Sequence, residues 1–144
     1  DGYLQMQKLC LEELLITISR IRLSGAVTEF SESYRIIQDA AGYISSNPSA
    51  DLSLNALSRK FAMSPSHFSK QFKKVTGVGM NEYVNLMRIA AAEKLLTDTN
   101  KPITDVALEC GFNDSNYFAA VFKKAKGITP KKFSLQYKNQ LDFL

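Results

Sequence analysis

The chain has 144 residues, of which 45% are hydrophobic, so it is long enough to bury a core of its own. It contains neither the roughly 20 consecutive apolar residues of a membrane span nor a secretory leader, which indicates a soluble cytoplasmic protein. The formal net charge of +4 is unevenly distributed, since residues 51–144 hold 14 basic and 8 acidic residues, an excess of the sign that attracts nucleic-acid phosphates.

The opening segment, residues 1–33, is predicted to be an amino-terminal helix followed by a linker. Its apolar residues recur at heptad spacing, although Gln7 interrupts the series, at Leu4, Leu11, Leu14, Ile18 and Ile21. Such a stripe forms either a homodimer contact or a surface that packs against a sensor domain outside this sequence, and the pattern allows both. Gly25 and the polar residues 28–33 indicate a linker before a helix at 34–47.

An internal repeat with an offset of fifty residues organises the rest of the chain. The offset matches Phe68, Phe72, Lys73, Lys74 and Gly77 with Phe118, Phe122, Lys123, Lys124 and Gly127. Two copies are too few for a solenoid, so the repeat predicts a pair of small subdomains. The phenylalanines fall on a helical period and are expected to be core residues, and no strand pattern competes.

Each copy is predicted to be a helix, a tight turn and a second helix. In the first copy, Ser53 is a suitable N-cap for a short helix that runs to about Phe61. The pair Ser64–Pro65 then opens a second helix, because serine caps helices and proline suits the first helical position. That helix is expected to end near Gly77.

The second copy follows the same order after a connecting helix at 80–97, a stretch without glycine or proline. At about 1.5 Å per residue this helix is roughly 27 Å long. With the helical bodies at its two ends added, the second helices of the two copies could lie about 34 Å apart, one turn of DNA. In the second copy a turn is expected at Gly111, and its second helix opens at Asn113 or Asp114. Thr129–Pro130 opens a closing helix.

These residues resemble the DNA-binding domain of the AraC/XylS family of bacterial transcription regulators. The second copy carries the family signature as Ile103-x-x-Val106-Ala107-x-x-Cys110-Gly111-Phe112 and Tyr117-Phe118-x-x-x-Phe122-Lys123-Lys124-x-x-Gly127-x-x-Pro130-x-x-Phe133. The first copy matches in Met63-Ser64-Pro65-Ser66-x-Phe68-Ser69-x-x-Phe72-Lys73-Lys74-x-x-Gly77, followed by Arg88-Ile89.

The resemblance implies an all-α fold with two helix-turn-helix subdomains and sequence-specific binding to double-stranded DNA. The second helix of each unit would enter one of two successive major grooves. RNA polymerase is a possible further partner of such a regulator. No cofactor or metal is implied. The expected divisions are a double helix-turn-helix domain at 34–139 and a tail at 140–144, the domain comprising a first unit at 34–78, the connecting helix at 79–98 and a second unit at 99–139.

The outward positions of the two second helices are the expected base-contacting residues, namely Ser66, His67, Ser69 and Lys70 in the first unit and Ser115, Asn116 and Tyr117 in the second. Lys70 can donate to guanine, and Asn116 can pair with adenine. The expected phosphate contacts are Ser53, Lys73, Lys74, Lys123, Lys124, Lys126, Thr129 and Lys131.

The sequence departs from the family pattern at three places. Ala119–Ala120 stands where the family often has a small polar residue and an arginine, so the second unit is expected to make fewer base contacts. Phe61 matches Gly111 at the repeat offset, so the first turn cannot rely on glycine for a positive φ and is expected to be built differently from the second. Ser134 replaces a common arginine, which removes an expected phosphate contact.

Other functional classes have weaker support in the sequence. His67 is the only histidine, and Cys10 and Cys110 lack metal-ligand spacing, so no catalytic triad or zinc site is predicted. No carboxylate pair or phosphate-binding loop indicates an enzyme. Arg88 is expected to be a structural residue. The alternative to DNA binding is a helical protein-interaction module that does not bind DNA.

Overall fold

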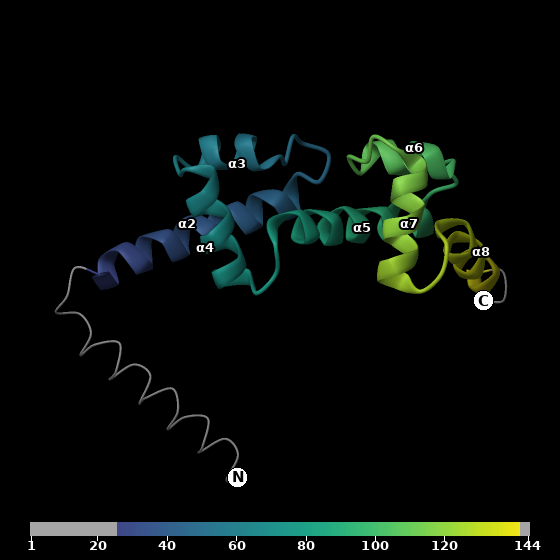
Figure 1. The fold of residues 1–144 in the computed structure, drawn as a ribbon. Helices are drawn as coiled ribbons and strands as arrows, with labels where there is room; N and C mark the ends of the chain where they lie inside the picture. Colours follow the sequence, from purple (N-terminus) through teal and green to yellow (C-terminus); the bar gives the residue numbers. More distant parts are fainter. Residues whose placement is uncertain (1–25, 142–144) are drawn as a thin grey trace, which may run out of the picture. The chain divides into compact units, whose positions relative to one another are not determined.

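The computed structural model describes residues 26–141, which form α-helices and no strand (Figure 1). The helices are α2 (Ala26–Ser46), α3 (Leu54–Lys60), α4 (Pro65–Thr76), α5 (Met80–Asp98), α6 (Ile103–Glu109), α7 (Ser115–Lys126) and α8 (Pro130–Leu141). The prediction of an all-α fold is confirmed. Across 26–141, no helix has the length and apolar character needed to cross a membrane.

The chain divides after Ile36, and the compact part that follows contains both copies of the repeat, each of which forms one helix-turn-helix unit. The heptad residues proposed for dimerisation, Leu4, Leu11, Leu14, Ile18 and Ile21, lie outside the described residues. Residues 28–33 differ from the prediction, because they belong to α2 and not to a linker. The stretch is polar but has no glycine or proline, and polar composition alone does not distinguish a loop from a solvated helix.

Two hydrophobic cores form around the two copies, and no buried residue belongs to both. The first core gathers Ile37, Ala40, Ile44, Leu52, Leu57, Phe68, Phe72, Met80 and Val84. The second core gathers Ile89, Ala92, Leu96, Val106, Ala107, Cys110, Phe112, Phe118, Phe122 and Phe133. The first half of α5 therefore belongs to one core and its second half to the other. The repeated phenylalanines are core residues, as predicted.

The turns inside the two units are built alike, which corrects the expectation for the first turn. Ala62 has a φ of 53° and Gly111 a φ of 90°, so both residues occupy the left-handed region. Their backbone hydrogen bonds also match: Ala62 N–H to Arg59 O and Met63 N–H to Ser58 O in the first turn, and Gly111 N–H to Leu108 O and Phe112 N–H to Ala107 O in the second.

The structural counterpart of Gly111 is therefore Ala62 and not Phe61. The first helices of the two units, α3 and α6, begin at Leu54 and Ile103, whereas the second helices, α4 and α7, begin at Pro65 and Ser115. The offset between the first helices is therefore one residue shorter than the offset between the second helices. Asn113 is the additional residue in the second turn. A constant offset concealed this insertion.

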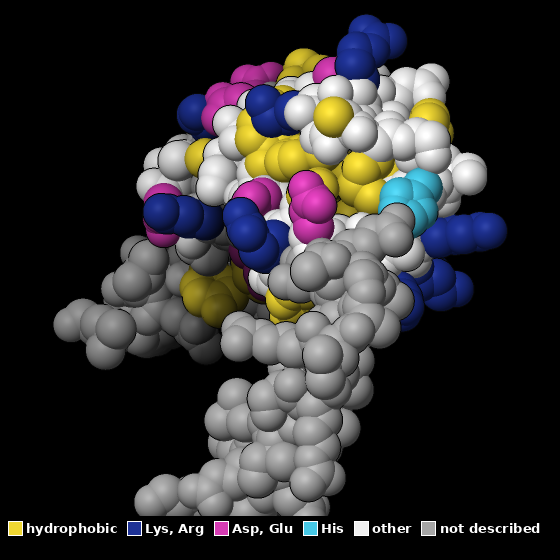
Figure 2. Space-filling model, turned by 90° about the vertical axis from the view of Figure 1, so that its left-hand side faces the viewer, with side chains coloured by type: hydrophobic (Ala, Val, Ile, Leu, Met, Phe, Trp, Pro, Cys, Tyr) yellow, Lys and Arg dark blue, Asp and Glu magenta, His cyan; other side chains and the backbone are white. Residues whose placement is uncertain are grey.

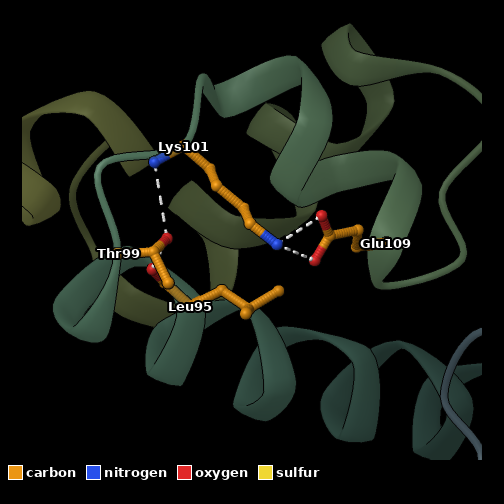
Figure 3. A network of polar contacts seen from close by, with 4 residues as sticks. All are labelled: Leu95, Thr99, Lys101 and Glu109. Carbon is orange, nitrogen blue, oxygen red and sulfur yellow. Dashed lines mark hydrogen bonds and ion pairs between the residues drawn. The ribbon is translucent and has the colours of Figure 1, made fainter.

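A network of polar contacts links the end of α5 to α6 (Figure 3). The Thr99 hydroxyl donates to Leu95 O at 2.6 Å and accepts from Lys101 N–H at 3.4 Å. Lys101 Nζ donates to both carboxylate oxygens of Glu109, at 2.6 and 2.8 Å. Both side chains are 43% exposed, so this ion pair stabilises the fold by no more than about 1 kcal/mol.

Candidate nucleic-acid interface

The outer face of α4 brings together the base-contacting residues predicted for the first unit. Ser64 caps the helix by accepting a hydrogen bond from His67 N–H at 3.4 Å, and Pro65 is its first residue. Phe68 and Phe72 are fully buried on the inner face and fix the rotation of the helix. The opposite face is exposed and carries Ser66, His67, Ser69, Lys70 and Lys73.

The outer face of α7 corresponds to this surface in the second unit. Of the two predicted starting residues, Asp114 is the cap, and its carboxylate accepts from the N–H groups of Asn116 and Tyr117 at 2.7 and 3.2 Å. Asn116 and Tyr117 are exposed, whereas Ser115 is half-buried. Ala120 is also exposed on this helix.

The helices α4 and α7 lie at opposite ends of α5 and run in similar directions away from α3 and α6 (Figure 1). Because Ser66 and Asn116 are both exposed, neither of the two outer faces is sealed inside the protein. The arrangement presents two equivalent helices on one scaffold, as two base-reading elements require.

Tyr117 is directed partly toward the connecting helix. Its hydroxyl accepts a hydrogen bond from Asn85 Nδ2 at 3.1 Å, and its ring lies 6.1 Å from that of Phe112. The side chain remains 54% exposed. Sequence reasoning missed Asn85, although Asn81 and Asn85, four residues apart on α5, were a detectable polar pair.

An apolar groove of about 630 Å³ borders α7 on the side of Ala120. Its apolar lining comes from Leu86, Ile89, Ala120, Val121 and Ala125, together with the Tyr117 ring. Alanine at 120 supplies no hydrogen-bond donor or acceptor to this surface. The outer face of α7 is therefore less polar than that of α4.

All the lysines predicted to contact phosphate are exposed, namely Lys73, Lys74, Lys123, Lys124, Lys126 and Lys131. Lys73, Lys74, Lys123 and Lys124 belong to the last turns of α4 and α7. Lys126 differs, because its ammonium forms an ion pair with Glu93 on α5. In the view of Figure 2, lysine and arginine side chains project from the surface around a central group of hydrophobic side chains.

The hydroxyl residues predicted to contact phosphate act as helix caps in the structure. Ser53 Oγ accepts from Ala56 N–H at 3.2 Å, and Thr129 Oγ1 accepts from Lys132 N–H at 3.4 Å. The Thr129 hydroxyl keeps its own hydrogen for donation, whereas the N–H and the hydroxyl of Ser53 both hydrogen-bond to the Asp51 carboxylate and lower its pKa. Ser134 is buried, and its hydroxyl donates to Leu96 O at 3.3 Å, so this residue belongs to the second unit's interior.

Arg88 lies between the two units and contacts both. Its Nε donates to Pro48 O at 2.9 Å and its Nη2 to Ala50 O at 3.3 Å, while its guanidinium carbon lies 5.8 Å from the centre of the Phe112 ring. Burial lowers the pKa of Arg88, and the nearby Asp51 carboxylate opposes that shift. These contacts agree with the structural role expected from the sequence.

The groups that could support chemistry other than binding are few in the described part of the chain. Within residues 26–141, no set of three or more histidine, cysteine, aspartate or glutamate side chains is placed to hold a metal ion. Cys110 is buried, and burial raises the pKa of its thiol to about 11. A thiol with this pKa is almost entirely protonated at neutral pH and is a poor nucleophile.

Comparison with known proteins places this arrangement among helix-turn-helix domains. A family described as "Helix-turn-helix domain" matches residues 57–136, more than half of the chain. The HTH-type transcriptional regulator YijO of Escherichia coli is 32% identical over 127 residues, which cover 88% of this chain and 45% of YijO. The chain spans about half the length, or less, of this and other curated relatives.

Two solved structures have the same fold. The C-terminal domain of AraT, a response regulator from Geobacillus stearothermophilus, is 29% identical, with a TM-score of 0.67 over 70% of this chain and 84% of that domain. The DNA-binding domain of the transcriptional factor AdpA, in complex with a target DNA, is 19% identical, with a TM-score of 0.69 over 72% of this chain and 94% of the other. At this identity, the second likeness concerns the fold alone.

Proposed function

The chain belongs to the AraC-type helix-turn-helix family of DNA-binding transcription regulators, and from this premise we propose that α4 and α7 enter two successive major grooves of one duplex. The observation that carries the proposal is the presence of two exposed, equivalently built helix faces at the two ends of α5. A major groove admits an α-helix, and a separation near one helical turn would place both helices on the same side of the DNA.

The first unit is proposed to provide most of the base discrimination. Lys70 lies on the exposed face of α4, where its ammonium can donate to guanine O6 and N7. Ser66 and Ser69 can donate to or accept from several bases, and His67 adds a further polar side chain to the same face.

The second unit is proposed to read fewer bases. Asn116 can pair with adenine N6 and N7, while Ser115 is half-buried and the Tyr117 hydroxyl is already bonded to Asn85. To contact a base, the Tyr117 hydroxyl would have to give up the hydrogen bond that it accepts from Asn85, or donate its own hydrogen to the base. Asn116 is therefore the residue most expected to specify a base in this half of the site.

Phosphate contacts are proposed to come mainly from the last turns of α4 and α7. Lys73, Lys123 and Lys124 are exposed there, and Lys74 and Lys131 lie on the same two units. The Ser53 and Thr129 hydroxyls, which cap α3 and α8, are proposed as additional donors, and a phosphate contact from Ser53 would compete with the Asp51 carboxylate. Lys126 is expected to contribute less, because a phosphate contact would compete with Glu93.

Three further features of the whole protein are proposed. The amino-terminal stripe is proposed to form a homodimer contact, with a sensor domain as its competing partner. RNA polymerase is proposed as a second partner of the DNA-bound protein. The chain itself is proposed to act by binding and not by catalysis, which the buried, protonated Cys110 and the lack of a second histidine support.

Selection of bound duplexes from a random pool, followed by titration of the selected and a scrambled duplex over a salt series, tests the proposal. We expect selective binding to the selected duplex. The logarithm of the association constant should fall linearly with the logarithm of the salt concentration, with a slope of about 0.9 for each phosphate neutralised. Equal and salt-independent binding to both duplexes, or no binding, would favour the alternative of a helical protein-interaction module.

A further inference from the structure

The two units have separate cores, so their relative orientation depends on α5 and on the contacts that cross between them. The segment between α2 and α3 approaches the turn between α6 and α7 above the middle of α5 (Figure 1). A Cβ atom added to Gly111 would lie 2.6 Å from Pro48 O. The backbones of the two units therefore meet at this point.

Arg88 occupies the same junction. Its guanidinium donates to the Pro48 and Ala50 carbonyls of the first unit, at 2.9 and 3.3 Å. Toward the second unit, Arg88 Nε would lie 2.9 Å from a Cβ on Gly111, and the guanidinium faces the Phe112 ring. The planar, multiply donating guanidinium can hold two carbonyls in a fixed direction, which a lysine ammonium does less well.

A second contact from α5 acts on α7 itself. Asn85 lies three residues before Arg88, on the same side of the helix, and donates to the hydroxyl of Tyr117 in the first turn of α7. Asn85 and Arg88 line one polar groove with Asp51, Asn113 and Tyr117. Through these two residues, α5 is tied to the first unit's segment before α3 and to the second unit's turn and reader helix.

We propose that Arg88 is a positioning residue that sets the orientation of α4 relative to α7 and thereby the spacing of the two half-sites that the protein accepts. The inference rests on the proposed function. One base pair added between the half-sites shifts them by about 3.4 Å and rotates them by about 34°, so a rigid pair of readers must either bend the duplex or lose a contact. If the two reader helices were loosely joined, they could adjust to the new spacing and keep both contacts.

The test uses the full chain and the duplex selected from a random pool, together with versions that have one base pair inserted or deleted between the half-sites. We expect the wild type to bind the selected spacing at least about tenfold more tightly than either altered spacing. Arg88→Ala is expected to reduce this preference to less than about threefold, because the duplex no longer has to deform. Arg88→Lys keeps the charge and is expected to show an intermediate preference.

Lys94→Ala is the matched control, since it removes the same charge from an exposed position of α5. It should keep the wild-type preference for spacing. Thermal unfolding shows which variants fold. If Arg88→Ala does not fold, the inference is tested on Arg88→Lys, by the ratio of its affinity for the selected spacing to its affinity for the altered spacings. A loss of affinity that is equal for all three spacings would overturn the inference, because it would show an effect on stability alone. If the wild type does not prefer the selected duplex over a random one, the proposed function fails instead.

Discussion

The two helix-turn-helix units have the same backbone hydrogen bonds in their turns but different residues at the left-handed position. Ala62 in the first unit is exposed, whereas Gly111 in the second faces Pro48 O and Arg88. A left-handed φ alone therefore does not require glycine in this fold. The requirement at Gly111 comes from the neighbouring unit, whose backbone occupies the space that a side chain would need.

The readers also differ between the units. The outer face of α4 combines serines, a histidine, Lys70 and Lys73. That of α7 has Asn116, Tyr117 and Lys123, but Ala120 stands in the place of Lys70, beside an apolar groove. The duplication has thus kept the scaffold and changed the chemistry presented to a partner. We expect the two halves of a binding site to be read with unequal stringency.

The largest effect should follow from Gly111→Ala. The new Cβ would be strained at a φ of 90° and would lie 2.6 Å from Pro48 O, so we expect the free energy of unfolding to fall. Left-handed strain and overpacking together suggest a loss of about 3 kcal/mol. Urea denaturation measures it, and a loss below about 1 kcal/mol would refute the close contact between the units.

Lys70→Ala should have the next largest effect, on specific binding. We expect a loss of about 2 kcal/mol on the selected duplex and relaxed base choice at one position, since a base-reading donor is removed. Asn116→Ala tests the second unit in the same way and should cost less. Equal effects of Lys70→Ala on selected and random duplexes would remove its assignment as a base reader.

Ala62→Gly should stabilise the protein. Ala62 is held at a φ of 53°, and glycine relieves left-handed strain of about 1 kcal/mol, partly offset by its greater freedom in the unfolded chain. The midpoint of urea denaturation should therefore rise. A decrease would show that the two turns are less alike than their hydrogen bonds indicate.

The smallest effect is expected from a single phosphate contact. Lys124→Ala should weaken binding to all sequences alike and reduce the salt slope by about 1. Lys126→Ala, from the same helix but paired with Glu93, should change the slope less. Anisotropy titrations at several salt concentrations compare the two, and a larger change for Lys126→Ala would reverse their proposed roles.

The helix boundaries could be predicted from the sequence wherever local chemistry determines them. Ser64–Pro65 opens α4, and Gly77 and Gly127 end α4 and α7 with φ values of 82° and 79°. These residues act through their own backbone preferences or through hydrogen bonds to nearby amides. The rotation of α4 was also predictable, because Phe68 and Phe72 share its buried face.

Features that depend on contacts between distant segments were beyond the sequence pattern. The extra residue Asn113 was hidden by a constant repeat offset, and residues 28–33 are helical despite their polar composition. The Asn85–Tyr117 hydrogen bond joins residues 32 positions apart, and Lys126 is engaged by Glu93 on another helix. No local signal specifies such partners. These contacts already engage the polar groups of Tyr117 and Lys126, two of the residues predicted to bind DNA.

Methylation interference on the selected duplex tests most directly whether two readers bind adjacent grooves on one side of the DNA. Methyl groups at guanine N7 block major-groove contacts, so they map where α4 and α7 enter. We predict two clusters of interfering positions centred about 10 base pairs apart. A single cluster, or two clusters separated by about half a helical turn and so on opposite sides of the duplex, would contradict the account.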